Sequence, residues 1–324
     1  MRKREIQAAV ILGDNATAVG DVETLSWSAA SKDREGWFKR LESGRSSLLL
    51  SDRNNIFETA APARQSRILI PLADDGLLLW ESLRRSPEGL SCAITSSETA
   101  RNALLSYTAG LDQIEKPEIA VLEEGILPNL QQAEEWFSSP VFDRILIREP
   151  LKKRLALQQA ENPEKFFSLL ASSAKLLLDK DGSMVILCSP PSMGQRISCL
   201  ISRECECSSE LSGRLEEAEN TFFSSENKDG AGLNWDKDVL INSFEAEGFS
   251  IKQLELIEQE EERLISIKDI NVWFDRENSR WGSFIGKMLE PDEFLQIKDS
   301  LQNRIGAGPV FWKWKSLLLR AQKG

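Results

Sequence analysis

The chain contains no histidine, so its chemistry must come from other side chains. Its 324 residues include 40 basic side chains, 51 acidic side chains and five cysteines. Without imidazole there is no Ser-His-Asp or Cys-His nucleophile system and no His-ligated zinc site. General acid–base work would therefore fall to Asp, Glu, Lys, Tyr107 or a thiol.

Polar side chains follow four predicted strands, each at the point where the strand ends. They are Asp74-Asp75-Gly76 after residues 67–72, Thr95 at the end of 91–95, Glu123-Glu124-Gly125 after 118–122, and Arg148-Glu149 after 142–147. Ligands of open α/β sheets bind beyond the carboxyl ends of the strands, which makes these residues candidates for a site. The plainer alternative is that the Asp residues shape a turn and cap a helix, and that the Glu residues are solvated.

The elements that carry these residues alternate between short apolar runs and helical stretches. The runs are 67–72, 91–95, 118–122, 142–147 and 183–188, and the helical stretches are 77–85, 97–108, 129–137 and 163–178. Such alternation predicts βαβ units with right-handed crossovers and a parallel sheet that is covered on both faces.

The last third of the chain has a different pattern. Residues 195–224 are polar and helical in character, and Asn234 is placed to cap a helix that ends at Gly248. Extended residues 249–267, helical residues 268–305 and a long strand at 310–319 follow. An antiparallel strand pair would then complete a sheet of seven strands.

Two segments resemble class I S-adenosylmethionine-dependent methyltransferases. Residues 67–85 are similar to the first motif of that family, in which a strand, a glycine loop and a helix follow one another. Residues 244–249 resemble its junction between a helix and the sixth strand. The resemblance covers about residues 60–324 and implies a Rossmann-like, seven-stranded, mostly parallel sheet with helices on both faces.

A closer resemblance is to the methyltransferase-like region fused behind AAA+ ATPases of the replication-associated recombination protein A family. The segments that carry it are Gly76–Arg85, Leu233–Asp236, Trp273-Phe274 and Pro309–Trp312. The chain contains no Walker A sequence. The resemblance implies a role in DNA recombination and a recombination-type AAA+ ATPase as partner.

The resemblance also implies a site for S-adenosylmethionine. Its residues would be Leu72, Asp74, Asp75, Gly76, Thr95, Glu124 and Arg148, with Glu124 near the adenine and Arg148 on the substrate side. The motif is degenerate: Ile70 stands at the acidic position of the first strand, and Leu72 and Asp74 stand at two glycine positions. Thr95 stands where a carboxylate normally holds the ribose.

Two hypotheses for function follow. The first is an S-adenosylmethionine-dependent methyltransferase-like protein of unknown acceptor, and the second is a non-catalytic interaction module beside the ATPase. The expected organisation is a helical appendage over residues 1–60 and a methyltransferase-like domain over 61–324 with a helical insertion at about 268–305.

Composition limits the partners and the compartment. The net charge of −11 argues against direct nucleic-acid binding, which needs clustered Lys and Arg. No apolar run is long enough to span a membrane, and an odd number of cysteines fits a reducing compartment, so we expect a cytoplasmic protein. The cysteine spacing matches no common zinc site, and the alternation in Phe311–Lys315 favours a half-buried strand over a stacking platform for bases.

Overall fold

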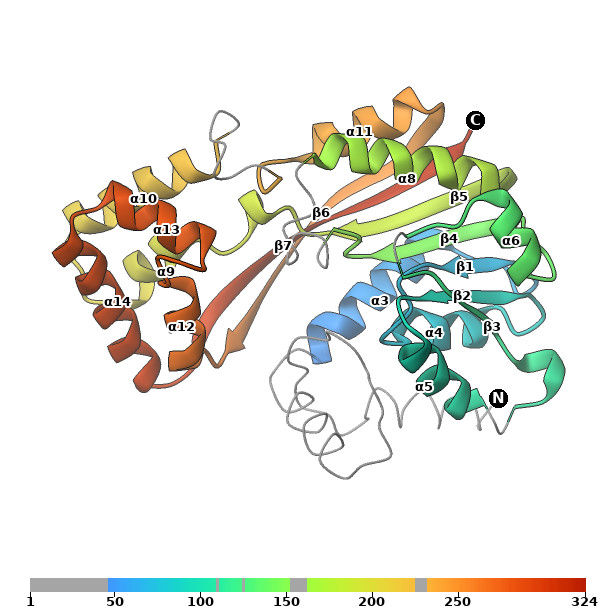
Figure 1. The fold of residues 1–324 in the computed structure, drawn as a ribbon, viewed down its shortest axis with the longest axis horizontal. Helices are drawn as coiled ribbons and strands as arrows, with labels where there is room; N and C mark the ends of the chain where they lie inside the picture. Colours follow the sequence, from blue (N-terminus) through green and yellow to red (C-terminus); the bar gives the residue numbers. More distant parts are fainter. Residues whose placement is uncertain (1–45, 109–110, 124–125, 152–161, 225–231) are drawn as a thin grey trace.

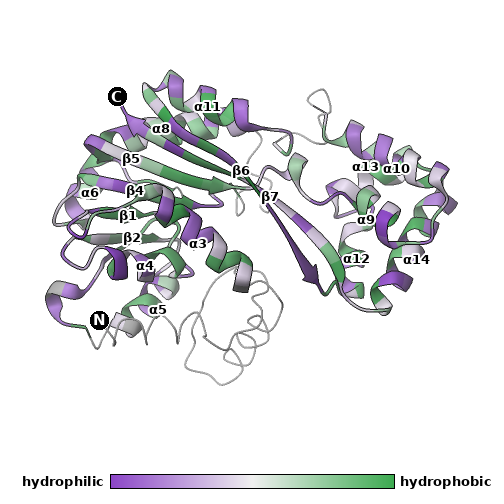
Figure 2. Cartoon of the chain, turned by 180° about the vertical axis from the view of Figure 1, so that it is seen from behind, coloured by the Kyte–Doolittle hydropathy of each residue, from purple (hydrophilic) through white to green (hydrophobic). Residues whose placement is uncertain are grey.

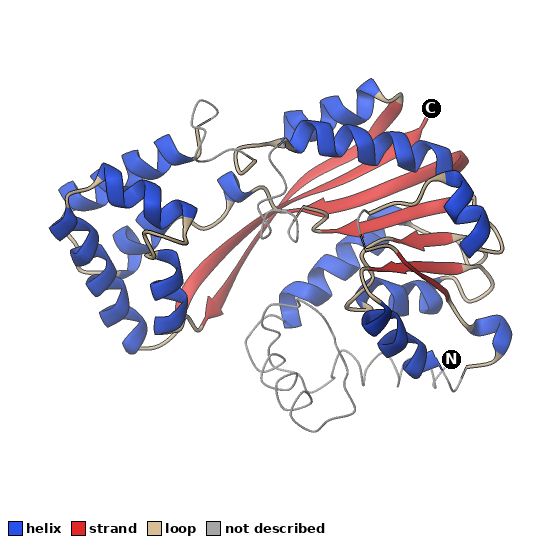
Figure 3. Ribbon diagram, in the orientation of Figure 1, coloured by secondary structure: helices blue, strands red, loops and turns tan. Residues whose placement is uncertain are grey.

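Two long strands join a helix-covered sheet to a separate group of helices (Figures 1 and 3). The structure is a computed structural model, and it describes residues 46–108, 111–123, 126–151, 162–224 and 232–324. The strands are β1 (Ile68–Ile70), β2 (Ser91–Thr95), β3 (Glu118–Val121), β4 (Phe142–Arg148), β5 (Leu178–Cys188), β6 (Phe249–Arg263) and β7 (Val310–Lys323). The helices are α3 (Ser46–Ala60), α4 (Leu77–Arg85), α5 (Glu98–Thr108), α6 (Leu130–Trp136), α8 (Pro163–Leu177), α9 (Ile197–Glu204), α10 (Ser209–Phe222), α11 (Lys237–Ala246), α12 (Ile267–Trp273), α13 (Arg280–Met288) and α14 (Pro291–Gly306), with short 3-10 turns at Gln113–Glu115 and Pro191–Met193.

The seven strands form one sheet in the order β3-β2-β1-β4-β5-β7-β6. The first five are parallel to one another, and β7 runs antiparallel between β5 and β6. The predicted Rossmann-like, mostly parallel seven-stranded sheet is therefore confirmed. Strands β1 and β2 are buried along their whole length, as expected where helices cover both faces of a parallel sheet.

Apolar side chains fill a layer on each face of the sheet. On one face, residues of α6, α8 and α11 pack against the strands, among them Phe137, Phe167 and Phe244. On the other face the layer comes from α3, α4 and α5 and includes Phe57 and Leu79. Burial of these layers is the main force that holds the strands in register.

Helix α3 is part of the second apolar layer. Its Ile56, Phe57 and Ala60 are at most 1% exposed. Arg144 of β4 donates to the Ala60 carbonyl over 2.8 Å, and Arg320 of β7 donates to the Thr59 carbonyl over 3.1 Å, so two cations cap the end of the helix. Residues 46–60 of the predicted appendage thus pack on the sheet, whereas residues 1–45 lie outside the described residues.

The helical lobe consists of α9, α10, α12, α13 and α14, which surround a third apolar core at the far ends of β6 and β7. Helices α12–α14 lie between β6 and β7, over residues 267–306. The buried carboxylate of Glu219 joins three of these helices, because it accepts bonds from Ile197 N, Ser198 N and Trp281 Nε1 at 3.0–3.1 Å. The contribution of α9 and α10 makes the lobe larger than the predicted insertion at 268–305.

Several local boundaries differ from those predicted. Asp236 caps α11 instead of Asn234, because its Oδ1 accepts bonds from the backbone N–H groups of residues 238 and 239. Trp235 beside it is 3% exposed and contacts the ring of Phe167 at 5.1 Å. Strand β5 begins at Leu178, before the predicted run at 183–188, and the extended segment predicted to reach 267 ends at Arg263.

Candidate functional site

The carboxyl ends of β1 and β4 lie side by side. At this position in the sheet, the chain leaves the two strands toward opposite faces. Strand β1 pairs with β2 on one side and with β4 on the other. The helix after β1, α4, packs on one face of the sheet, and the helix after β4, α8, packs on the opposite face. Such a switch point leaves a crevice beyond the strand ends, where open α/β sheets bind ligands.

Two residues at this edge hold a left-handed backbone conformation without being glycine. Leu72, after β1, has φ 56°, and Glu149, after β4, has φ 50°. This conformation costs an L-residue about 1–2 kcal/mol. Strain of this kind gathers at functional positions, and both of these residues lie just beyond the carboxyl ends of neighbouring strands. Leu72 thus adopts a backbone conformation that favours glycine, while its side chain packs on the apolar core.

The Asp74 carboxylate holds the loop that follows β2. Its Oδ1 accepts a bond from Ser96 N and its Oδ2 one from Ser96 Oγ, both over 2.7 Å. Bonds to a charged acceptor are among the stronger ones in proteins. Asp74 therefore acts as a clamp between two strand ends, and both of its oxygens are engaged in that clamp.

Asp75 and Arg148, both predicted as site residues, contact each other directly. Arg148 donates to Asp75 Oδ2 over 2.7 Å, and its guanidinium lies 3.8 Å from Asp52 Oδ2 of α3. The second Asp75 oxygen accepts a bond from Leu77 N at the start of α4. Burial lowers the pKa of Arg148, but the charges of Asp75 and Asp52 outweigh that effect and the pKa ends above its usual value. Arg148 thus remains charged and paired.

Gly76 allows the tight entry into α4. It has φ 67°, and a Cβ at this position would overlap Trp80 Nε1 and lie 3.0 Å from Leu104 Cδ2. In the Rossmann arrangement, a glycine at this loop lets a ligand approach the backbone closely. Here an indole and a leucine of the protein itself occupy the space above the glycine.

Thr95 does not face the crevice. It is 1% exposed, and its Oγ1 lies 3.2 Å from the Ser97 carbonyl and 3.3 Å from the Ala120 carbonyl, so its proton is bonded within the protein. The predicted adenine-side residue Glu124 lies outside the described residues. Leu72, Asp74, Asp75, Gly76 and Arg148 are therefore the predicted residues that meet at the edge.

Glu149, a candidate from the sequence, belongs to a second polar cluster at this edge, whose other members, Ser189 and Ser316, were not predicted as site residues. Glu149 accepts bonds from Ser189 N at 3.2 Å and Ser189 Oγ at 2.6 Å, and Ser189 Oγ lies 2.9 Å from Ser316 Oγ of β7. The cluster joins the carboxyl ends of β4 and β5 to the middle of β7. The available signal was an acid at the end of one strand and a serine at the end of the next, which meet only because β4 and β5 are neighbours.

The described residues do not fit S-adenosylmethionine. The cofactor's ribose hydroxyls and its charged amino-acid end require polar groups that face outward. Instead, Asp74 is bonded to Ser96, Asp75 to Arg148 and Thr95 to backbone carbonyls. Ile70, at the acidic position of the motif, is 1% exposed and apolar.

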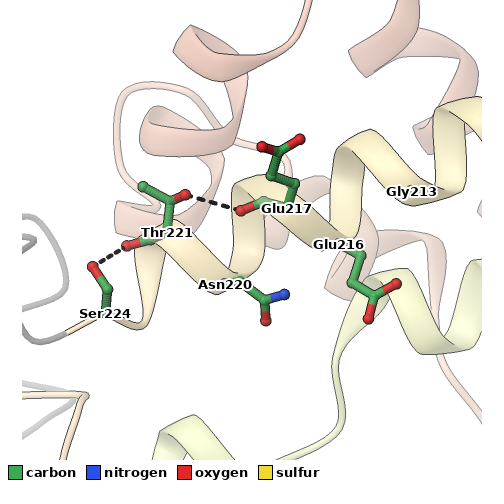
Figure 4. A pocket seen from close by; sticks show the side chains of 6 residues that line it. All are labelled: Gly213, Glu216, Glu217, Asn220, Thr221 and Ser224. Carbon is green, nitrogen blue, oxygen red and sulfur yellow. Dashed lines mark hydrogen bonds between the residues drawn. The ribbon is translucent and has the colours of Figure 1, made fainter.

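Other parts of the described chain offer no better site. An open hollow of about 580 Å³ lies along α10, lined by Gly213, Glu216, Glu217, Asn220, Thr221 and Ser224 (Figure 4). Its two hydroxyls donate to backbone carbonyls of the same helix end, so they are not aimed at a ligand. Within the described residues, no group of three or more His, Cys, Asp or Glu side chains could hold a metal ion. None of the described helices is long and apolar enough to cross a membrane.

Comparison with known proteins finds similarity at the level of the fold. No family model matches the chain, and no curated protein matches it. A putative methyltransferase from Bacillus halodurans C-125 aligns at 13% identity and TM-score 0.46, over 84% of this chain and 99% of the other. A mycolic acid cyclopropane synthase complexed with SAH and CTAB aligns at 15% identity and TM-score 0.45, over 98% and 97%.

Geranyl diphosphate methyltransferase, in complex with GPP and sinefungin, aligns at 10% identity and TM-score 0.45, over 98% of this chain and 94% of the other. At these values the fold assignment rests on the strand order and strand directions of this chain's own sheet. The chain has the Rossmann-like, seven-stranded fold of the class I methyltransferases.

Proposed function

We propose that this protein uses a methyltransferase-like fold as a binding scaffold and does not transfer methyl groups. The observation that carries the proposal is the ion pair of Asp75 with Arg148, which joins the loop after β1 to the end of β4 across the crevice. The polar groups beside it are bonded to one another in the same way. The strand ends are thereby fixed as a rigid surface.

The free energy of opening this edge supports the proposal. Separating one partner of a buried ion pair costs about 3–5 kcal/mol, and each charge-assisted bond of Asp74 adds about 1.5–3 kcal/mol. Since about 1.4 kcal/mol is a tenfold change in affinity, breaking the Asp75–Arg148 pair alone would weaken a cofactor's affinity at least a hundredfold. A cofactor would also have to displace the Trp80 ring from above Gly76.

A second candidate is methyl transfer from S-adenosylmethionine to an acceptor that this chain does not identify. The left-handed backbone at Leu72 and Gly76 favours it, because a glycine loop adopts that conformation, although Leu72 and Asp74 stand at two of the motif's glycine positions. In this alternative the side chains would rearrange to release Asp74, Asp75 and Arg148. Binding of S-adenosylmethionine separates the two candidates.

As partner we propose a recombination-type AAA+ ATPase, on the strength of the sequence resemblance. Two of the segments that carry the resemblance contact each other, because Trp273 of α12 and Trp312 of β7 lie 5.7 Å apart between ring centroids. A third places Trp235 under Phe167. These residues build the helical lobe and its junction, so the resemblance would extend to the lobe as well as to the sheet.

The experiment is to mix the full chain with a purified ATPase of the replication-associated recombination protein A family. Size-exclusion chromatography with light scattering would measure the mass of the complex. We expect a stable complex that forms equally well with and without S-adenosylmethionine. Two separate peaks at micromolar concentrations of both proteins would contradict the proposed partner.

A further inference from the structure

Strand β6 forms an edge of the sheet and runs far beyond it. It is last in the strand order and pairs with β7 alone among the described strands. Beyond the last β5–β7 pair, residues 257–263 of β6 and 310–316 of β7 continue as a two-stranded arm to the helical lobe (Figures 1 and 3). The two long edges of this arm differ in whether other described residues bond to their backbone groups.

The β7 edge of the arm is covered by side chains from around α9. Phe311 N donates to Glu204 over 3.3 Å, and Lys313 N donates to Gln195 over 3.0 Å. Arg203 donates to the Phe311 carbonyl. These bonds satisfy backbone groups that would otherwise invite another strand.

The same bonds fix which backbone groups of β6 point outward. In an antiparallel pair, two opposed residues either bond to each other or both point away. The N–H groups of Phe311 and Lys313 point away from β6, so their partners Glu262 and Glu260 point away from β7. By the two-residue period of a strand, Glu258 does so as well. We call the outward-facing backbone of Glu258, Glu260 and Glu262 the free edge.

No described residue is recorded as bonding to the backbone of the free edge. Its three glutamate side chains are exposed and lie on one face of the arm, opposite Lys315, Lys313 and Phe311. Glu258 pairs with Lys315 over 2.8 Å and Glu260 with Arg203 over 3.2 Å, yet these two carboxylates remain 59% and 47% exposed. Figure 2 shows this part of β6 as strongly hydrophilic.

The negative charge of the free edge indicates which kind of strand can pair with it. Antiparallel pairing with the same edge of a second copy would place glutamate against glutamate, and like charges opposite each other destabilise a sheet. A strand with Lys or Arg at alternate positions would instead place a cation across from each glutamate. Its backbone would meanwhile complete the outward hydrogen bonds, which is the mode of recognition known as β-augmentation.

We propose that the free edge binds an extended basic segment of a partner protein as an added strand. The proposal rests on the proposed binding role, because it names the surface and the chemistry through which a partner would attach. The added strand would lie alongside β6 within the arm.

The test uses the full chain and a fluorescent peptide of sequence KTKVKTKVK, with binding measured by anisotropy. An acidic peptide, ETEVETEVE, serves as the control for non-specific pairing. The first variant is Glu258→Lys, Glu260→Lys and Glu262→Lys together. Its matched control changes three exposed glutamates of α10 in the same way: Glu210→Lys, Glu216→Lys and Glu217→Lys.

A second pair of variants distinguishes the contribution of the backbone hydrogen bonds to peptide binding from that of the glutamate charge. Glu260→Pro removes an outward N–H without removing a bond to β7, and Glu260→Gln removes the charge alone. We expect the triple lysine variant and Glu260→Pro to lose about tenfold or more in affinity, and the α10 control and Glu260→Gln to lose about threefold or less. Circular dichroism checks that each variant is folded.

Equal binding of the basic peptide by the wild type, the triple variant and Glu260→Pro would overturn the inference. A wild-type dimer that Glu260→Pro disrupts would also overturn it, because a second copy would then occupy the free edge. If Glu260→Pro still forms the ATPase complex while no variant changes peptide binding, the inference fails and the proposed function stands. If the wild type binds the peptide but no ATPase, the free edge stands and the proposed partner fails.

Discussion

The Arg148 guanidinium donates to the Asp75 carboxylate over 2.7 Å and so ties the end of β4 to the loop after β1. The two residues are 73 positions apart, and they close a crevice in which this fold can hold a ligand. Asp52 of α3 lies 3.8 Å from the same guanidinium, so the pair also anchors the first described helix. The Asp75–Arg148 ion pair therefore contributes to the stability of the fold and also closes the edge at which a ligand could bind.

Replacing Arg148 should destabilise the protein strongly. Arg148→Met removes the cation that pairs with Asp75 and lies near Asp52 in a largely buried position, and we expect a loss of about 3 kcal/mol in the free energy of unfolding. Arg64→Met is the matched control, because Arg64 and Glu88 are both more than half exposed and such pairs contribute less than about 1 kcal/mol. Urea unfolding of both variants measures the difference. Equal losses would show that the Arg148 pair is not buried as described.

Two glycines should respond in opposite directions to the same change. Gly76→Ala places a Cβ in a left-handed position against Trp80, and we expect it to cost about 2 kcal/mol or more. Gly213→Ala adds a methyl group within α10 where no atom lies within 4 Å, and should stabilise by about 0.5–1 kcal/mol. Thermal unfolding distinguishes them. A neutral Gly76→Ala would mean that the loop adopts another conformation.

The elements of the fold were predictable from the sequence, whereas the contacts between strand ends were not. Apolar runs between polar turns located the strands and helix 77–85 correctly, because burial on both faces of a parallel sheet leaves a clear pattern. The pattern holds no information on which strand ends become neighbours, so the Asp75–Arg148 and Glu149–Ser189 contacts were not predictable. The residue type of Leu72 does not indicate a left-handed backbone, since leucine rarely adopts it, although Leu72 stands at a glycine position of the motif that the segment resembles.

The contact between α3 and α4 should make stability depend on pH. Burial raises the pKa of Glu81, but hydrogen bonds from Arg84 and Arg85 and the charge of Arg53 bring it below its ordinary value. The stability that this carboxylate contributes is therefore present above its unfolded pKa of about 4.3 and is lost as pH falls through its lowered folded pKa.

Glu81→Gln should remove this contribution, so the unfolding free energy of the variant should depend less on pH in the acidic range. Urea unfolding at a series of pH values from neutral downward compares the two proteins. The difference in unfolding free energy between wild type and Glu81→Gln should shrink as pH falls. A difference that stays constant with pH would contradict the role of the Glu81 charge.

Four of the five thiols should react in a fixed order with a thiol reagent. Cys199 is exposed, whereas burial raises the pKa of Cys205 to about 11 and raises the pKa values of Cys92 and Cys188 further. Because the thiolate is the reactive form, Cys199 should react first and Cys205 more slowly. Cys92 and Cys188 should react only after unfolding. Mass spectrometry of the modified peptides at timed intervals gives the order, and early labelling of Cys188 would contradict the burial of β5.

The most direct test of the central claim is the melting temperature of the full chain with S-adenosylmethionine and, separately, S-adenosylhomocysteine at millimolar concentration. A ligand present at about 100 times its Kd adds about 2.7 kcal/mol to stability, which is several degrees for a domain of this size. The closed edge at Asp75 and Arg148 predicts no shift with either compound. A shift of several degrees with either one would contradict the closed edge and favour the second candidate, methyl transfer.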